Sequence, residues 1–477
     1  MRAKLLWLLL ACSCTQVEEA PPKEQEPPQD TGPPSPSTGE VRVQGGCAVQ
    51  PDNVLRYDCT FTLPAPGPLT VTVEGGGRTR TLEGSTATLQ HEMTVFLLTP
   101  QTDYIWSANS GPDVATGGFT TGPLPAAVDL RATVTGSGTT DSIVIPFQCG
   151  APGHLVAINE RGDVEWYQDM TQELGEDLNS LSVTGFDATT ESAIALLHHS
   201  HITEFDWRGR PLGSASLGTD YDLPTHHSVY RRDGKRFVLN AEAYPLVDGT
   251  YLLDGVYIFD TAWSVLGSWS LRDLLTPSGG GMPGGYWGAE FPGAIDFSHS
   301  NSIYVDEQGD WILSMRGLHT VIKVRGDLDA PDFGALMWSL SSTAWSPFGT
   351  DYLVTSAGGI TAKLDFSDQH HAHFEDDGGL WVFDNRGFGE HSRGIRMSLD
   401  DTFAVADIDR SLDLPERCSV QSSVYRLPNE HALLTCATSQ TLYEFDTTSP
   451  DPIWQATVTC GEDGRAPTTH RGQPIFW

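Results

Sequence analysis

From about residue 130 onward the chain repeats two kinds of short strand pair, and this repeat restricts the fold more than any other feature. One kind turns at Gly or Asp and occurs at 226–240, 299–316, 370–385 and 422–436. The other has a strand with an aromatic residue and an acid, then a strand ending near Trp; it occurs at 153–168, 202–216, 256–270, 321–339 and 442–457. Several units of four strands are typical of a β-propeller. We predict an all-β fold whose residues 126–477 form a propeller of about six blades.

A solenoid of β-repeats is the alternative fold for such a pattern. The repeats are separated by irregular insertions, which fit propeller loops better than solenoid turns. The insertion at 276–293 is rich in Gly and aromatic residues. It forms either part of a substrate rim or a plain surface loop.

Residues 41–122 show alternating polar and apolar residues in short runs broken by Gly and Pro. This pattern predicts a small antiparallel β-sandwich in front of the propeller. The segment at 98–106 resembles the L-x-P-x-T-x-Y stretch of fibronectin type III or immunoglobulin-like domains. In those domains the tyrosine packs at a strand corner, so we expect Tyr104 to be structural.

The N-terminal sequence predicts a lipoprotein signal peptide. Arg2 and Lys4 precede an apolar run that is too short to span a bilayer, and the run ends in Leu-Leu-Ala-Cys. We expect removal of residues 1–11, acylation of Cys12 and attachment to a membrane of the cell envelope, with the outer membrane favoured. The alternative is an ordinary secretory signal in which Cys12 is incidental, and Cys14 is a weaker lipid site. Residues 12–40 are rich in Pro and Glu and predict an extended tether.

The chain has a formal net charge of −34. Such a charge argues against nucleic acid and anionic membrane surfaces as partners. It also repels anionic substrates, so an anion site in this protein must carry its own positive groups.

The predicted signal would export the chain and its eight cysteines to a compartment in which disulfides can form. Cys47 and Cys59 lie close in sequence and form the favoured pair. Two more bonds are expected among four cysteines whose pairing the sequence leaves open: Cys149, Cys418, Cys436 and Cys460. Their spacing does not match a zinc site, and we predict no metal.

Three successive repeats begin with histidines. His226 and His227 open one strand, and His299 and His370 open the next two. A propeller places corresponding positions of its blades around one axis, so these imidazoles should converge on the central channel. The second strand of each hairpin runs back to the end of the channel where the first strand began. In the hairpin of His299 that second strand ends at Arg316, which brings Arg316 close to the histidine.

Four motifs in this region resemble, in order and spacing, those of the bacterial arylsulfotransferases. The segment 296–324 resembles an H-x-N-S stretch followed by an acidic turn and S-x-R. The segment 369–387 is similar to a Q-H stretch leading to F-D-N-G. The segments 226–240 and 419–436 are similar to the H-H-D and S-x-x-R-L-P-N-G-N stretches of that family.

The resemblance implies a sulfotransferase that uses no nucleotide sulfate donor and no cofactor. It implies that His370 is the nucleophile, supported by His299, Arg316 and either His226 or His227. The sulfuryl group would pass from a phenolic sulfate ester to a phenol by a ping-pong route through a sulfohistidine. In some relatives the sandwich helps to form a dimer, so a homodimer is left open here.

Three further residues inside these segments are expected to bind substrate. They are Asn301, Asn385 and Arg386. Asn301 lies two residues after His299, on the same face of a strand.

The sequence departs from the family pattern at several positions. Ser228 stands where the family has an acid after its paired histidines, and that turn is one residue shorter. His371 and His373 lie beside His370, so the choice of nucleophile rests on its spacing to Asn385. In the last repeat Glu430 and His431 replace the usual Gly-Asn.

Two other functions compete with this interpretation. A tethered propeller could be a non-catalytic module that binds a glycan, peptide or envelope protein. Three histidines with Asp296 or Asp368 could instead bind a transition metal in a hydrolase or oxidoreductase. A pure scaffold has no reason to place His299, Arg316 and His370 on one axis, and metal sites rarely include an arginine beside the ligands.

Overall fold

The computed structural model describes most of the chain after residue 41. The described residues are 42–84, 88–150, 152–174, 178, 181–279, 281–283, 286–341, 346–356, 366–386, 391–402, 404–461, 464–467 and 469–477. The predicted signal, Cys12 and the tether lie outside these residues. Within the described chain, no helix is both long and apolar enough to cross a bilayer.

The first seven strands form two small antiparallel sheets. One sheet has the order β1-β2-β5 and the other β4-β3-β6-β7. Their bounds are β1 (Gln44–Gln50), β2 (Asn53–Gly67), β3 (Thr70–Gly75), β4 (Arg78–Glu83), β5 (Thr88–Val95), β6 (Asp103–Ser110) and β7 (Asp113–Thr120). The predicted Cys47–Cys59 disulfide joins facing residues of β1 and β2. Tyr104 is buried, and its hydroxyl accepts a hydrogen bond of 2.8 Å from the backbone N–H of Thr99, as expected of a structural corner.

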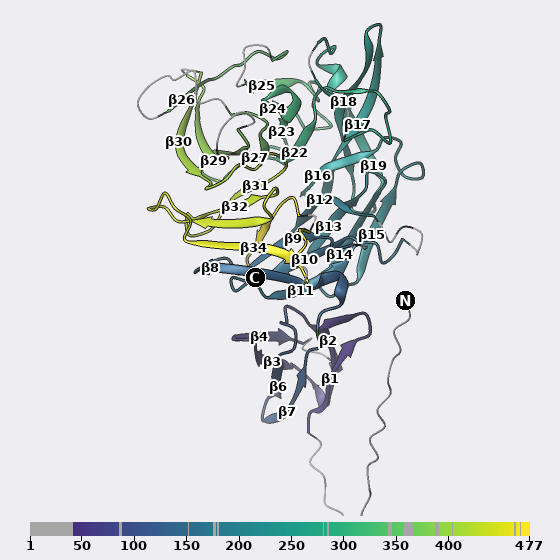
Figure 1. The fold of residues 1–477 in the computed structure, drawn as a ribbon. Helices are drawn as coiled ribbons and strands as arrows, with labels where there is room; N and C mark the ends of the chain where they lie inside the picture. The colour runs from purple at the N-terminus through teal and green to yellow at the C-terminus, as the bar shows by residue number, and fades with distance from the viewer. Residues whose placement is uncertain are drawn as a thin grey trace, which may run out of the picture. The chain divides into compact units, whose positions relative to one another are not determined.

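The remaining strands form six sheets that are the blades of a propeller, which confirms the predicted fold class (Figure 1). Blade 1 contains β9 (Ser142–Phe147), β10 (His154–Ile158), β11 (Val164–Asp169) and β35 (Gln473–Ile475). Blade 2 contains β12 (Val183–Ala188), β13 (Ser192–Leu197), β14 (His201–Asp206) and β15 (Pro211–Ser216). Blade 3 contains β16 (Thr225–Arg232), β17 (Lys235–Leu246), β18 (Gly249–Phe259) and β19 (Val265–Ser270), with the short β20 (Met282–Pro283) and β21 (Ile295–Asp296).

The last three blades follow the same plan. Blade 4 contains β22 (Ser300–Val305), β23 (Trp311–Met315), β24 (Thr320–Val324) and β25 (Leu336–Ser341). Blade 5 contains β27 (His370–Phe374), β28 (Leu380–Asp384), β29 (Arg393–Asp400) and β30 (Val405–Asp413), and β26 (Leu353–Ser356) pairs with β30. Blade 6 contains β31 (Ser423–Arg426), β32 (Ala432–Cys436), β33 (Thr441–Phe445) and β34 (Trp454–Cys460), to which β8 (Leu130–Gly136) adds an outer strand.

The repeated acid and tryptophan of the sequence have structural roles. The acid lies in the turn to the outer strand and accepts two backbone N–H groups, as Asp260 does from Ala262 and Ser264 at 2.8 Å each. The tryptophan indole reaches the next blade. Trp269 donates to the carbonyl of Gly334 at 3.1 Å, and Trp454 of the last blade donates to Glu160 of the first at 2.8 Å. These bonds fix each blade against its neighbour.

The two ends of the propeller sequence close the ring. Strand β35 forms the inner edge of blade 1, and β8 forms the outer edge of blade 6, so both sheets contain strands from distant parts of the chain. A disulfide joins Cys149, after β9, to Cys460 at the end of β34. The ring is therefore held by strand pairing and by a covalent bond.

Candidate active site

The inner strands of blades 3, 4 and 5 each have an irregularity near their first residues. The pairing register shifts between Thr225 and Val229 in β16, and between His370 and His373 in β27. A similar shift lies between Ser300 and Ser302 in β22. A bulge breaks the simple alternation of side chains and redirects them, and such bulges are frequent beside active sites.

Hydrogen bonds between blades show which inner-strand positions correspond. Ser228 Oγ accepts the N–H of Ile303 at 3.3 Å, and Ser302 Oγ accepts the N–H of Ala372 at 3.0 Å. Ser228, Ser302 and His371 therefore occupy equivalent positions in blades 3, 4 and 5. The residues just before them, His227, Asn301 and His370, are equivalent as well. His299 corresponds instead to Asp368, and both have a positive φ, of 45° and 51°. In blade 4 the position equivalent to His370 is thus occupied by Asn301, and His299 lies two residues before it.

His370 is almost completely buried, and only one side of its ring is anchored. Nδ1 lies 2.7 Å from Oδ1 of Asn385 and 2.9 Å from the carbonyl oxygen of Asp368. Both neighbours are acceptors, so Nδ1 carries the proton and Nε2 of the neutral ring keeps its lone pair. Among the described residues, Nε2 has no hydrogen-bond partner. The lone pair is therefore available to a ligand.

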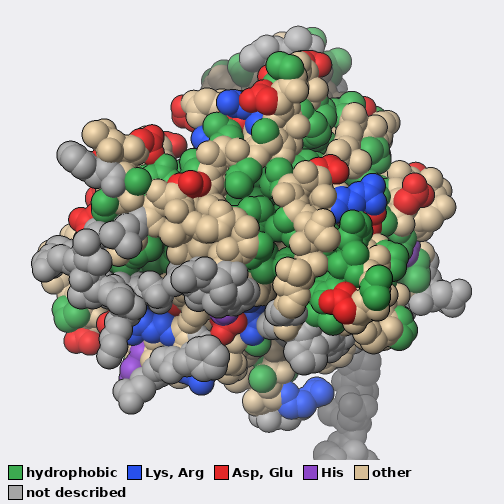
Figure 2. All heavy atoms as spheres, turned by 90° about the horizontal axis from the view of Figure 1, so that it is seen from above, with side chains coloured by type: hydrophobic (Ala, Val, Ile, Leu, Met, Phe, Trp, Pro, Cys, Tyr) green, Lys and Arg blue, Asp and Glu red, His purple; other side chains and the backbone are tan. Residues whose placement is uncertain are grey.

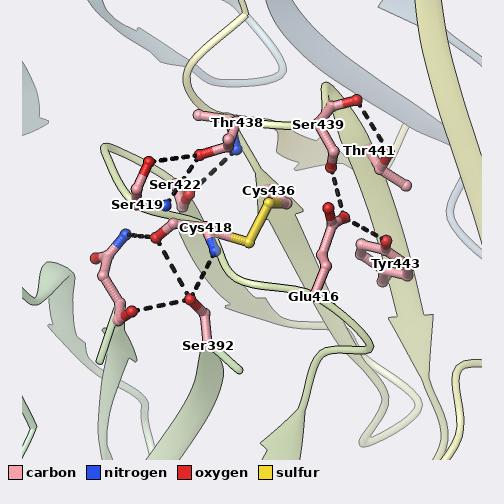
Figure 3. The surroundings of a disulfide bond; sticks show 12 residues. Ser392, Glu416, Cys418, Ser419, Ser422, Cys436, Thr438, Ser439, Thr441 and Tyr443 are labelled. Atoms are coloured by element: carbon pink, nitrogen blue, oxygen red, sulfur yellow. Dashed lines mark hydrogen bonds between the residues drawn. A yellow bond between two sulfur atoms is a disulfide. The ribbon is translucent and has the colours of Figure 1, made fainter. Parts of the chain in front are cut away.

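The orientation of the Asn385 amide is fixed by backbone carbonyls. Its Nδ2 donates to Cys418 at 2.7 Å and to Gln421 at 3.1 Å, which leaves Oδ1 to face His370. The loop that supplies these carbonyls is held by the Cys418–Cys436 disulfide and by Ser392 (Figure 3). Ser392 Oγ accepts the N–H of Cys418 at 2.8 Å and donates to the Asn385 carbonyl at 3.0 Å. The nucleophile candidate is thus connected, through Asn385, to a disulfide-bonded loop that leads into blade 6.

Arg316 supplies a positive charge close to His370. It begins the 3-10 helix η4 (Arg316–Leu318) directly after β23, and its Nε lies 3.5 Å from a carboxylate oxygen of Asp368. Burial, and then the charge of Arg316, lower the pKa of His370 to about 3. His370 therefore stays uncharged at neutral pH beside a permanent cation, which is the combination a nucleophile for an anionic substrate needs.

His299 and His227 repeat the arrangement of His370. Nδ1 of His299 lies 2.5 Å from Asp296, an acceptor that assigns the proton to Nδ1. Nδ1 of His227 lies 2.8 Å from Nδ1 of His226, whose Nε2 is 3.1 Å from Asp254. If His226 donates to Asp254, its Nδ1 is the acceptor and His227 is the donor. Nε2 of both His227 and His299 is then left as a lone pair, and their ring centroids are 4.9 Å apart.

These buried groups affect one another's protonation. Burial, followed by the charges that His299 and His226 would carry, lowers the pKa of His227 well below its usual value. Burial alone would raise the pKa of Asp254, but hydrogen bonds from His226, Ser298 and Ser300 lower it. Asp254 is therefore a carboxylate that orients the His226–His227 pair.

The insertion at 276–293 contributes an aromatic wall to the histidine cluster. The Tyr286 ring lies 4.6 Å from His227 and 5.5 Å from His299, and the Trp287 ring lies 5.0 Å from His226. Of the two interpretations of this insertion, the contacts of Tyr286 and Trp287 favour the substrate rim. The rings of Tyr286 and Trp287 are nearly perpendicular, at 84°, and aromatic side chains of this kind suit contact with an aromatic ligand.

His199 was not among the predicted site residues, although it belongs to the cluster. Its ring lies 4.6 Å from Trp287 and 5.1 Å from Tyr286, and its Nδ1 lies 3.1 Å from the carbonyl of Thr225. Burial, and then neighbouring His226, lower its pKa to about 4. In the sequence His199 stands at a strand end without a family motif, so only the three-dimensional contact with blade 3 reveals it.

The three residues expected to bind substrate make contacts within the protein. Asn301 Nδ2 donates to the carbonyl of Gln369 at 2.7 Å and holds the residue before His370. Arg386 lies 3.6 Å from Asp384 and 3.8 Å from Asp413. Asn385 anchors His370, as described above. Their contacts with a substrate remain predictions.

Basic side chains are scattered among acidic ones on the molecular face seen in Figure 2. Among the described residues, no group of His, Cys, Asp and Glu has an arrangement that could hold a metal ion. The positive charge that this acidic chain needs for an anion is instead provided at the cluster by Arg316.

Comparison with known proteins identifies a family. A family model described as Arylsulfotransferase (ASST) matches residues 143–401. No curated protein matches the chain.

Several solved structures resemble the fold. A protein of unknown function from Bacteroides caccae is 11% identical, with 71% of this chain and 100% of that chain covered and a TM-score of 0.40. Virginiamycin B lyase from Staphylococcus aureus is 8% identical, with 69% and 99% covered and a TM-score of 0.33. The WD40 β-propeller domain of Doa1 is 9% identical, with 71% and 100% covered and a TM-score of 0.31. At these scores the fold assignment rests on the strand pairing of this chain.

We predict that the protein loses stability as the pH falls from 7.5 to 5. His370 and His470, with pKa values of about 3, and His199, at about 4, are neutral when folded, whereas unfolded histidine binds a proton below about pH 6.5. The unfolded state therefore binds more protons, and each such histidine removes about 1.4 kcal/mol per pH unit below pH 6.5. Urea unfolding at several pH values measures the slope.

The variant His470→Phe should show a shallower slope, because one titrating group is removed. Glu165 acts in the opposite direction, since burial raises its pKa to about 7 and its protonation favours the folded state as the pH falls. A free energy of unfolding that stays constant or rises between pH 7.5 and 5 would contradict the assignment of neutral buried histidines.

Proposed function

Because this chain belongs to the arylsulfotransferase family, we propose that it transfers a sulfuryl group from a phenolic sulfate ester to a phenol through His370. The observation that carries this proposal is the anchoring of His370, whose Nδ1 is bonded to Asn385 and Asp368 and whose Nε2 is unpartnered among the described residues. A neutral imidazole nitrogen beside a guanidinium is suited to attack an anionic ester.

The first half of the reaction forms a sulfohistidine. Nε2 of His370 attacks the sulfur of the donor, the bond between sulfur and the aryl oxygen breaks, and a phenolate leaves with the bonding electron pair. Arg316 binds the sulfonate oxygens as charge spreads over them, and positioning together with charge stabilisation dominates the rate, as in phosphoryl transfer. The attacking nitrogen, Nε2 of His370, carries no proton, so none must be removed before the attack.

The second half returns His370 to its neutral form. The oxygen of the acceptor phenol attacks sulfur, the nitrogen–sulfur bond breaks, and the phenol proton passes to Nε2 of His299 or His227. The imidazolium of His299 is stabilised by Asp296, 2.5 Å from its Nδ1. That proton is available to the next departing phenolate. No proton is gained or lost over the whole cycle.

The aromatic part of donor and acceptor has a defined place in this proposal. Tyr286 and Trp287 lie against the histidines and place aromatic side chains where a phenyl ring would bind. The anionic sulfate is drawn by Arg316, which offsets the general repulsion by a chain of net charge −34.

We predict that His370→Asn lowers transfer from 4-nitrophenyl sulfate to a phenol by at least about 10³-fold, because the nucleophile is removed. Arg316→Ala should lower kcat/KM for the donor by about 10²–10³-fold, because charge stabilisation is lost. Release of nitrophenol in the presence of acceptor measures both rates.

The matched control is His431→Asn, which removes a histidine that pairs with Glu444 in blade 6. That variant should keep the wild-type rate. Full turnover by folded His370→Asn would eliminate His370 as the nucleophile.

Asn385 should act as a positioning residue. In Asn385→Ala, Nδ1 of His370 loses its side-chain acceptor, so the ring is less well oriented and kcat should fall by about 10- to 100-fold. KM for the donor should change little, because the sulfonate contact with Arg316 remains. Steady-state kinetics separate the two constants, with the exposed Asn429→Ala as control. An unchanged kcat, or a loss seen only in KM, would rule out this role.

We also propose that the mature protein is a lipoprotein of the cell envelope, acylated at Cys12. The sequence motif supports this, and the three disulfides are compatible with an oxidising compartment. Cys12→Ala should move the protein from the membrane fraction to the soluble fraction, whereas Cys14→Ala should leave it membrane-bound. Membrane association of Cys12→Ala would refute the lipid site.

A further inference from the structure

The propeller has a cavity apart from the histidine cluster, called here the second cavity. The inner strands that carry the cluster also line this cavity. This cavity has a volume of about 340 Å³ and is bordered by residues from β12, β16, β22, β27 and β31 and by the segment 471–476 around β35. All six blades therefore contribute to it, which places it on the central channel. The described residues that line it do not include His227, Arg316 or His370, so the cavity is distinct from the transfer site.

The first feature that points to a ligand is the buried cation of Arg471. This side chain lines the cavity, and the residue is only 8% exposed. Its guanidinium lies beside the hydroxyl of Tyr425, and among the described residues it makes no ion pair with a carboxylate. Burial of an unpaired charge is costly, so this position favours an anion.

The acids that border the cavity do not neutralise Arg471. Asp187 is bonded to Arg231 at 2.8 Å, and Glu375 is bonded to His373 at 3.1 Å. Asp376 is exposed to solvent at the edge of the cavity. The charge of Arg471 is therefore left for another group.

The second feature is the unpartnered nitrogen of His371. The ring is buried, and Nδ1 has no hydrogen-bond partner among the described residues. Because Nδ1 has no partner, we assign the backbone hydrogen bond with Val424 to the other nitrogen. Burial together with the charge of Arg471 keeps the ring neutral by lowering its pKa. Nδ1 therefore offers a lone pair, which would be satisfied by a hydroxyl donor.

The third feature is the aromatic wall. Tyr230 and Tyr304 line the cavity with ring centroids 5.1 Å apart, and Tyr425 lies 4.3 Å from the His371 ring. Phe374 lines the same space. Cavities with flat apolar walls and a few polar groups are typical of sites for small aromatic molecules.

We propose that this cavity binds a small hydroxylated aromatic anion. Its anionic group lies against Arg471, its ring lies among Tyr304 and Tyr425, and its hydroxyl donates to Nδ1 of His371. Binding here requires no covalent step and does not use His370, so the proposal goes beyond the transfer reaction.

Titration calorimetry with 4-hydroxybenzenesulfonate tests the proposal, because the carbon–sulfur bond of this probe cannot supply a sulfuryl group. Wild-type protein should bind it at two sites. Arg471→Gln should weaken one of them by at least about 10-fold, whereas the exposed Arg208→Gln should leave both unchanged. Asp376→Asn should tighten the same site by about 2- to 5-fold, because a nearby negative charge is removed. Such a gain could not result from misfolding.

The variant Arg316→Ala separates this site from the transfer site. If Arg316→Ala loses one site and Arg471→Gln loses the other, both proposals are supported. If Arg316→Ala keeps both sites and Arg471→Gln loses one, the second cavity stands and the role of Arg316 fails. Two unchanged sites in folded Arg471→Gln, or no effect of Asp376→Asn, would overturn the second site.

Discussion

The hydrogen bond between Nδ1 of His370 and Oδ1 of Asn385 determines what the rest of the site can do. An imidazole has two nitrogens, and only the one without a proton can attack sulfur. The amide of Asn385 is turned by the carbonyls of Cys418 and Gln421, so its oxygen faces the ring and keeps the proton on Nδ1. The Cys418–Cys436 disulfide and Ser392 hold that loop in place, as Figure 3 shows. The orientation of His370 in blade 5 therefore depends on contacts with the loop that leads to blade 6.

Burial and charge act together on the same ring. Burial keeps His370 neutral, and the adjacent Arg316 makes its protonation still less favourable. In the proposed reaction the same arginine binds the sulfate of the donor. The surrounding histidines are also buried, so each additional positive charge would be costly. In the proposed reaction His299 or His227 accepts the phenol proton, and for His299 the neighbouring Asp296 compensates the transient charge. In a chain with net charge −34, this local arrangement is what makes an anion site feasible.

The sequence predicted the features that depend on local pattern. Strand alternation and repeated turns predicted the blades, the short separation of Cys47 and Cys59 predicted their bond, and a strand-corner motif predicted the buried Tyr104. The repeat also predicted that histidines gather at one end of the channel. It did not predict the bulges, so His299 was expected to match His370 although it corresponds to Asp368. His199 was missed because its contacts come from folding of a distant insertion, and its own segment has no distinguishing motif.

The most direct test of this account is to locate the sulfuryl group on the protein during turnover. Protein mixed with 4-nitrophenyl sulfate in the absence of acceptor would be quenched in alkali, digested and fragmented in a mass spectrometer. The account predicts one added SO₃ group on His370, absent from the adjacent His371 and lost when a phenol is added before quenching. A sulfuryl group on any other residue, or rapid transfer with no modified protein at any time, would contradict it.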